Sequence, residues 1–362
     1  MKRYIFLFAF CTWVSTHIHG HKGVSKDTAK VEKKANFGPL FKNDDVIKLR
    51  IVTNIKALQK DRGASPSNHW AELYYARKKK GDLKIPIKLK VRGNFRKASK
   101  NCIFPPLLLD LPQKKDKNSI FERQNRLKLV THCQSEEYIF NEYLVYRMYN
   151  LITNYSFRAR IAQVTYEDSA GLQKPVTSYA FLLEDEDDMA KRNKAKDYTI
   201  KQIPMTRIDS LQMATVAVFE YMIGNTDWSV PYLHNIKLLA PKGGKYPIPV
   251  PYDFDHSGIV EAKYAQPAEQ LELASVRERL YRGLTYPPAL LQQVFARFKA
   301  AKPEIYALYQ NNPHLKPGYI KRTLRYLDDF YSIIDNPKDV KRLLIYGGGK
   351  PQAAGVVIKG LN

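Results

Sequence analysis

Two neighbouring polar segments carry the residue types from which a catalytic or metal site is built. The first is Asn225-Thr226-Asp227-Trp228 with His234-Asn235, and the second is Tyr252-Asp253-Phe254-Asp255-His256-Ser257-Gly258. Carboxylate and amide oxygens suit Mg²⁺ or Mn²⁺ rather than zinc. If the two segments fold together, a divalent cation could be bound by the side chains of Asp227, Asn235, Asp253 and Asp255. The alternative is that these are ordinary loop residues making Asx-turns, helix caps and surface contacts.

Regular elements precede both segments and can hold them in a cleft. Residues 210–223 are apolar without interruption, which predicts a buried helix that ends just before Asn225. Short strands at 236–239 and 248–250 flank a Lys-Gly-Gly-Lys turn and predict a hairpin between the two segments. This hairpin would fold the second segment back onto the first, where a rigid scaffold can present polar side chains.

The N-terminal half of the chain is predicted to be rich in strands. Apolar and polar residues alternate in the first three strand-like runs, and a helix with uninterrupted helical spacing is expected at 136–152. The expected strands are 46–52, 71–75, 85–91, 103–111, 127–130, 159–166 and 176–183.

Helices predominate after about residue 190. The acidic run 184–188 opens a short helix through Arg192, and the later helical runs alternate with Pro-rich or polar loops. These later helices are expected at 269–280, 288–301 and 319–334, followed by a flexible tail with one edge strand at 355–358.

This order of elements resembles the protein-kinase-like fold, in which a strand lysine holds phosphates, a helix glutamate holds the lysine, and loop residues serve the nucleophile and the metal. The resemblance assigns Lys128 to the phosphates and Glu142 to orienting Lys128, with Glu137 on the same helix as the alternative. The strand that ends at Leu183 would lead into a hinge at Glu184, where an adenine would sit.

More closely, the chain resembles the CotH-like family of atypical kinases over roughly residues 40–283. By that likeness Asp227 is the catalytic-loop acid, Asn235 and Asp253 are metal ligands, and Asp255 is a second metal-facing or phosphate-facing carboxylate. The stretches that carry the resemblance are Val91-Arg92-Gly93-Asn94, residues 179–184, residues 188–193, Asn225-Thr226-Asp227 with His234-Asn235, and Tyr252-Asp253-Phe254-Asp255.

The chain also departs from the kinase pattern. It has no G-x-G-x-x-G loop, only Arg92-Gly93-Asn94, and the spacing from Asp227 to Asn235 is longer than in kinase catalytic loops. Asp255 stands where a glycine is expected after Asp-Phe. Arg92 and Arg96 form either an anion site near the phosphates or a solvated strand end, and His234 either touches phosphate or metal or is a hydrogen-bonded loop histidine.

The resemblance implies an α+β, two-lobed fold with a β-rich N-lobe at 37–183 and a mainly helical C-lobe at 184–345. It implies an atypical kinase that uses ATP and Mg²⁺ or Mn²⁺ to phosphorylate a protein or another hydroxyl-bearing acceptor. The alternative is a non-catalytic cell-envelope binding module, a pseudokinase that holds an anionic ligand or polymer.

The first twenty residues indicate export. Lys2 and Arg3 precede an apolar run to Val14 and small or polar residues to Gly20, a pattern typical of a secretory signal and too short to span a bilayer. A basic tail is expected at 21–36 and a flexible C-terminal tail at 346–362. An exported chain then keeps two cysteines, Cys102 and Cys133, for which a disulfide is favoured over two buried thiols.

Composition and net charge limit the classes of binding partner that the chain is expected to have. The chain has 362 residues, 44% of them hydrophobic, with 59 Lys and Arg against 35 Asp and Glu, which excludes a disordered chain and favours an anionic partner. No aromatic and basic stacking motif or helix-turn-helix pattern accompanies the basic clusters, so nucleic acid is not expected. Neither G-x-S-x-G nor H-E-x-x-H occurs, so hydrolase chemistry of those types has no support.

Overall fold

The computed structural model describes residues 38–77, 81–112 and 119–345, which form an α+β structure. The predicted signal segment and both predicted tails lie outside these residues. None of the helices in the described ranges combines the length and apolar character that a membrane span requires.

Seven strands close into a barrel in the order β1-β2-β3-β4-β5-β7-β6. Strand β1 runs parallel to β6, and all the other neighbouring strands are antiparallel. The strands are β1 (Ile47–Thr53), β2 (His69–Arg77), β3 (Gly81–Val91), β4 (Leu107–Asp110), β5 (Arg126–Thr131), β6 (Ala159–Asp168) and β7 (Val176–Leu183). The alternating residues that predicted these strands point alternately into the barrel core and outward, as in β3. The sequence predicted a β-rich region but not its closure.

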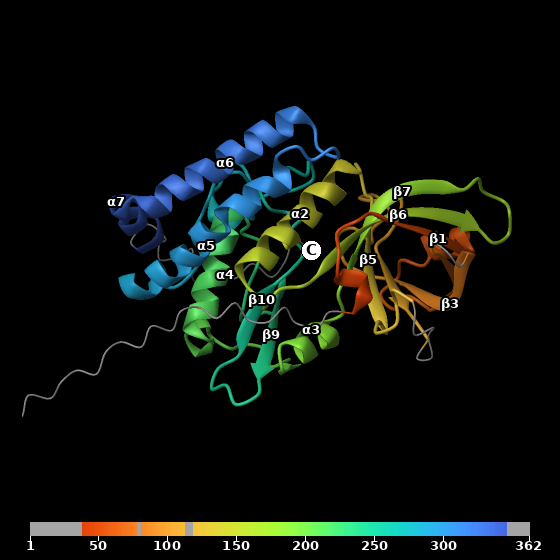
Figure 1. Ribbon diagram of the computed structural model, residues 1–362, viewed down its shortest axis with the longest axis horizontal. Coiled ribbons are helices and arrows are strands. Elements are labelled where there is room, and N and C mark those ends of the chain that lie inside the picture. The colour runs from red at the N-terminus through yellow and green to blue at the C-terminus, as the bar shows by residue number, and fades with distance from the viewer. Residues whose placement is uncertain (1–37, 78–80, 113–118, 346–362) are drawn as a thin grey trace, which may run out of the picture. The chain divides into compact units, whose positions relative to one another are not determined.

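Helix α2 (Glu137–Ile152) connects the barrel to the helical part of the chain, since it contacts β6, β7 and α5 (Figure 1). Outward-facing Val130, Ile161 and Phe181 of the barrel share one core with α2 and the later helices. These are α3 (Glu186–Arg192), α4 (Ser210–Ile223), α5 (Pro288–Tyr309), α6 (Pro317–Asp335) and the short α7 (Pro337–Val340). The short helix α1 (Ile55–Lys60) packs instead into the core of the barrel.

A small antiparallel sheet separates the two polar segments, as the sequence predicted. Strands β9 (Ile236–Pro241) and β10 (Ile248–Pro251) form the expected hairpin, and β8 (Ala195–Asp197) adds an edge that was not predicted. Helix α4 matches its predicted bounds and ends at Gly224, whose φ of 67° closes the helix in the left-handed conformation. The first polar segment therefore starts directly at a fixed helix end.

Two predicted helices differ from the structure. The helix expected at 269–280 is only a 3-10 turn, Glu269–Leu271, because Glu272 adopts a φ of 51° and ends it. Helix α5 instead continues past the expected end through Pro303, because Ile305 and Tyr309 are fully buried in the core beyond the proline. Tertiary packing here outweighs the local cost of an interior proline.

Candidate active site

A pocket of about 280 Å³ brings the two predicted polar segments together. Asp227 and Asn235 from the first segment and Asp253 and Asp255 from the second all line it. The loop between β3 and β4 contributes Arg92 through Arg96 to the same pocket. The convergence of these four side chains, expected from the order of helix, hairpin and loops, is therefore present.

Asp227 is held from several directions. Its Oδ1 lies 2.7 Å from Nε2 of His234, while Nδ2 of Asn235 donates to the Asp227 carbonyl at 2.8 Å and to Oδ2 at 3.1 Å. The backbone N–H of Asp227 donates to Oδ1 of Asn225 at 3.0 Å. Burial disfavours a charged imidazole, yet the hydrogen bond and the charge of Asp227 raise the pKa of His234. A carboxylate fixed in this way is preorganised for contact with a reacting group.

Among the described carboxylates of the pocket, that of Asp253 has the fewest hydrogen-bond and ion-pair partners. Its backbone N–H donates to the hydroxyl of Tyr146 at 2.8 Å, but within the described ranges its carboxylate has no hydrogen-bond or ion-pair partner. Burial and the neighbouring charges of Asp255 and Asp227 raise the pKa of Asp253, against the opposing charges of Arg96 and Arg92. Asp253 and Asn235 also have φ angles of 64° and 51°, the kind of backbone strain that is often held at functional sites.

Arg96 joins two buried carboxylates. Its Nη2 lies 2.5 Å from Oε2 of Glu142, and its Nε lies 2.9 Å from Oδ2 of Asp255, which also accepts from the Tyr264 hydroxyl at 3.0 Å. Burial raises the pKa of Glu142 to about 8 despite the charge of Arg96. Burial acts in the same direction on Asp255, but Arg96, His256 and the Tyr264 hydroxyl together lower its pKa. Asp255 Oδ2, predicted to face a metal or phosphate, is therefore already paired with a cation.

The predicted pair of Lys128 and Glu142 is not formed. Lys128 Nζ instead lies 2.7 Å from Oε1 of Glu186, and Lys237 lies 2.9 Å from the other oxygen of that carboxylate. Burial and the charge of Arg92 lower the pKa of Lys128. The reason for the difference is that the β3–β4 loop inserts Arg96 beside Glu142. The alternative helix residue, Glu137, pairs with Lys316 rather than with Lys128.

Glu184, predicted to lie at the adenine hinge, has a buried and fully engaged carboxylate. It accepts from Arg192 Nε at 2.8 Å and from the backbone N–H of Arg158 at 3.0 Å. Neither Glu184 nor Lys128 lines the pocket, although Lys128 lies beside Tyr252, which does, at 5.3 Å from its ring centroid. Arg92 does line the pocket, and in the part of the chain that the structure describes its side chain has no ion-pair partner.

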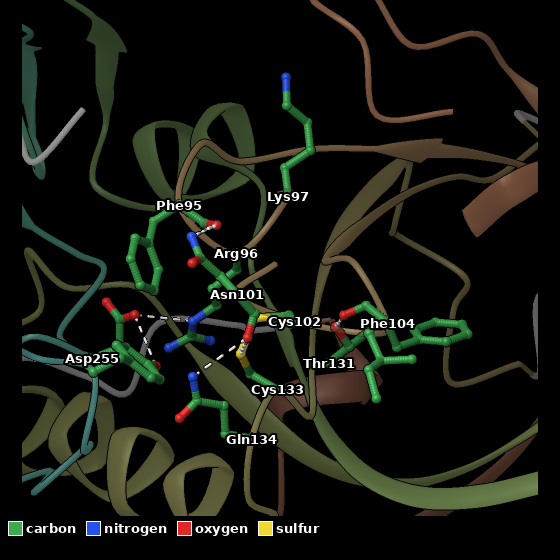
Figure 2. Close-up of a disulfide and its surroundings, with 12 residues drawn as sticks. Phe95, Arg96, Lys97, Asn101, Cys102, Phe104, Thr131, Cys133, Gln134 and Asp255 are labelled. Carbon is green, nitrogen blue, oxygen red and sulfur yellow. Dashed lines mark hydrogen bonds and ion pairs between the residues drawn. A yellow bond between two sulfur atoms is a disulfide. The ribbon is translucent and has the colours of Figure 1, made fainter. Parts of the chain in front are cut away.

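The loop that carries Arg92 and Arg96 is anchored by the predicted disulfide between Cys102 and Cys133, whose Cα atoms are 4.7 Å apart. Figure 2 shows the Arg96 guanidinium directed at the Asp255 carboxylate, with the disulfide nearby on the same loop. Arg62 adds backbone anchors by donating to the carbonyls of Lys97 and Cys102 at 3.0 and 2.7 Å. The loop is therefore fixed at both Arg96 and Cys102.

A divalent cation fits only part of the predicted ligand set. Among residues 38–77, 81–112 and 119–345, no three His, Cys, Asp or Glu side chains are grouped so that they could hold a metal ion. Asp253 has a free carboxylate, and Asn235, whose Nδ2 faces Asp227, keeps its Oδ1 available. Mg²⁺ commonly takes one or two protein ligands and completes its shell with water and substrate phosphates. Asp253 and Asn235 meet that smaller requirement.

Sequence reasoning missed several residues of the site. Nothing in the sequence distinguishes Tyr146 and Tyr264, which bond to the acidic loop, from tyrosines of the core. Arg282 and the buried Glu220 lie in segments without a polar motif. The only available signal was a charged residue within an otherwise apolar run, which Glu220 provides in the helix at 210–223. Tyr146 and Arg282 bond to segments 107 and 54 residues away, so spacing could not reveal their roles.

No protein-family model matches the chain, and no curated protein matches it. Among solved structures, the chain is similar to the crystal structure of a Helicobacter pylori proinflammatory kinase, CtkA, at 12% sequence identity. The similarity covers 75% of this chain and 90% of that chain, with a TM-score of 0.36.

Proposed function

We propose that the protein is an exported atypical kinase, which transfers phosphate from ATP to a protein or another hydroxyl-bearing acceptor. The observation that supports this most is the carboxylate of Asp253, which has no partner among the described residues and lies in the same pocket as the firmly held Asp227 and the cationic Arg92. Phosphoryl transfer needs this combination of a metal ligand, an oriented carboxylate and a cation for phosphate. The two-lobed arrangement, with a boundary at residues 183–184, belongs to the same proposal.

Each residue has a distinct part in this proposal. Asp253 and Asn235 would hold Mg²⁺ or Mn²⁺, which when bound would neutralise charge on the phosphates. Asp227 would orient the acceptor hydroxyl and take up its proton, because His234 and Asn235 fix its carboxylate. Arg92 is the cation best placed for the phosphates, and Lys128 is a second one behind Tyr252. Asp255 would act mainly through Arg96.

One observation favours the alternative, a non-catalytic module that binds an anionic ligand. The Arg96 guanidinium already pairs with both Glu142 and Asp255, and Asp255 is the carboxylate expected to serve a second metal. A pocket in which, among the described residues, only Asp253 has a free carboxylate and arginines lie nearby can hold an anion without transferring a phosphoryl group. Dependence of nucleotide binding on a metal and on Asp253 distinguishes the two functions.

We predict that ATP raises the melting temperature of the protein only with Mg²⁺ or Mn²⁺, and that Asp253→Ala removes this shift. A ligand that binds only the folded state stabilises it by about 2.7 kcal/mol at a hundredfold excess over Kd. A thermal-shift titration of wild type, Asp253→Ala and the control Asp110→Ala, an exposed barrel residue, measures this. An unchanged shift in Asp253→Ala would contradict the metal site, and the absence of any shift in wild type would favour the binding module.

A further inference from the structure

A third segment of the chain, residues 276–283, lies against both loops of the pocket. The Val276 carbonyl is so close to Gly258 and Gly224 that a Cβ on either glycine would lie only 2.4 or 3.0 Å from it. Arg277 Nη1 donates to the Gly258 carbonyl at 3.3 Å. Since Gly258 ends the acidic segment and Gly224 precedes Asn225, this segment touches the loop that carries Asp227 and the loop that carries Asp253.

Arg282 of this segment donates hydrogen bonds to the backbone on both sides of Asp227. Its Nη1 donates to the carbonyl of Thr226 at 2.5 Å and to the carbonyl of Trp228 at 2.8 Å. The residue is only 6% exposed, and its guanidinium lies 5.5 Å from the centroid of the Trp228 ring. Hydrogen bonds from a charged donor are stronger than neutral ones, particularly away from water.

A further hydrogen bond, to Asn225, fixes the same stretch of backbone. Asn225 accepts from the Asp227 N–H, so the backbone of Asp227 is tied on its N–H side by Asn225 and through both neighbouring carbonyls by Arg282. Arg282 does not line the pocket, although its charge interacts with that of Asp227. Its hydrogen bonds to the carbonyls of Thr226 and Trp228 fix the loop backbone on both sides of Asp227.

We propose that Arg282 is a positioning residue that fixes the Asp227 loop, so that the Asp227 carboxylate faces the bound nucleotide and acceptor. This inference rests on the proposed phosphotransfer function. Both bonds come from Nη1, whose two N–H bonds lie in the fixed plane of the guanidinium, whereas the ammonium of lysine stands on a shorter side chain and rotates freely, so it does not reproduce that geometry. Misplacement of a catalytic group by about 1 Å can cost roughly a hundredfold in rate.

The decisive variant is Arg282→Lys, which keeps the charge but not the two-carbonyl geometry. We expect the rate of ATP turnover by the full chain to fall about 10-fold to 100-fold, while the Kd for ATP with Mg²⁺ changes less than about threefold because Arg282 lies outside the pocket. Amide hydrogen exchange in residues 225–235 should become faster, since the loop loses its anchors.

The matched control is Arg160→Lys in the barrel. Arg160 is 5% exposed and also donates to backbone carbonyls, those of Leu40, Asn43 and Asp45, but it lies outside the pocket. We expect it to lower stability without changing turnover or exchange in residues 225–235. Equal effects of the two variants on turnover and on this exchange would overturn the proposal.

The two readouts separate this inference from the proposed function. If wild type shows no turnover and no nucleotide binding, the proposed function fails, and exchange in residues 225–235 still decides whether Arg282 holds the loop. If Arg282→Lys does not fold, Arg282→Gln, which retains a donor but no charge, replaces it. Normal exchange in residues 225–235 of a folded Arg282 variant would contradict the role of Arg282.

Discussion

Arg96→Met is expected to destabilise the protein by about 3–5 kcal/mol, the cost of leaving buried charges without their partner. Arg96 is 7% exposed, and Glu142 and Asp255, which it joins, are 0% and 5% exposed. Removal of the guanidinium leaves both carboxyl groups buried without their cationic partner. They would then have to stay protonated or remain as unpaired anions, so the loss should be larger at pH 8 than at pH 5.

Urea unfolding of the full chain at these two pH values measures the effect. Arg50→Met is the matched control, because the pair of Arg50 and Glu167 is 38% and 40% exposed at its side chains and should be worth less than about 1 kcal/mol. The triple variant Arg96→Met, Glu142→Gln, Asp255→Asn should recover part of the loss, since no buried charge remains. A cost of Arg96→Met no greater than that of Arg50→Met would show that the three groups are not a buried ionic unit.

Glu220→Gln is expected to stabilise the protein at alkaline pH and to leave it nearly unchanged near pH 4.5. Burial raises the pKa of Glu220 to about 8 from its ordinary value of 4.5, with Asp227 adding to the shift and the Asn225 and Arg282 side chains opposing it. Neither carboxyl oxygen has a hydrogen-bond partner among the described residues. The folded protein therefore keeps the proton that the unfolded chain releases.

The sign of the pH effect follows from this difference. Between pH 4.5 and about 8 the folded state binds more protons at Glu220, so its stabilising contribution is complete below pH 4.5 and is lost as pH rises through 8. At about 1.4 kcal/mol per pKa unit the loss is at most roughly 5 kcal/mol. A glutamine of the same shape carries no such loss, so the advantage of the variant should grow with pH.

Chemical denaturation of wild type and Glu220→Gln from pH 4.5 to 8.5 gives the two stability profiles. We expect them to diverge by a few kcal/mol at the alkaline end, whereas Glu304→Gln, at an exposed position of α5, should follow wild type throughout. Parallel profiles for wild type and Glu220→Gln would mean that Glu220 titrates at its ordinary pKa, and the account of its burial would be wrong.

Local patterns predicted the elements that hold the site. The uninterrupted apolar run at 210–223 gave α4 with its observed bounds, and the hairpin between the two polar segments brought Asp227 and Asn235 to Asp253 and Asp255 as expected. These features succeed because they depend on periodicity and on chain order over a few tens of residues.

Local sequence patterns did not predict the contacts between residues far apart in the chain. Barrel closure requires β1 to pair with β6 more than a hundred residues later, and no local pattern encodes that register. Lys128 and Glu142 looked like partners on the kinase likeness, but Arg96, 46 residues before Glu142 and 159 before Asp255, takes the carboxylates. The hydrogen bond from Arg282 to the Trp228 carbonyl, 54 residues away, could not be predicted from the sequence either.

The central claim, that Asp227 acts in phosphoryl transfer from ATP, is tested most directly by following the γ-phosphate. Full-length wild type and Asp227→Asn are incubated with γ-labelled ATP and Mg²⁺ or Mn²⁺, and phosphate transferred to protein or released to water is measured beside the Kd for ATP. The account predicts transfer by wild type and a loss of at least about 100-fold in Asp227→Asn, with ATP still bound. Absence of transfer by wild type, or equal transfer by both proteins, would contradict it.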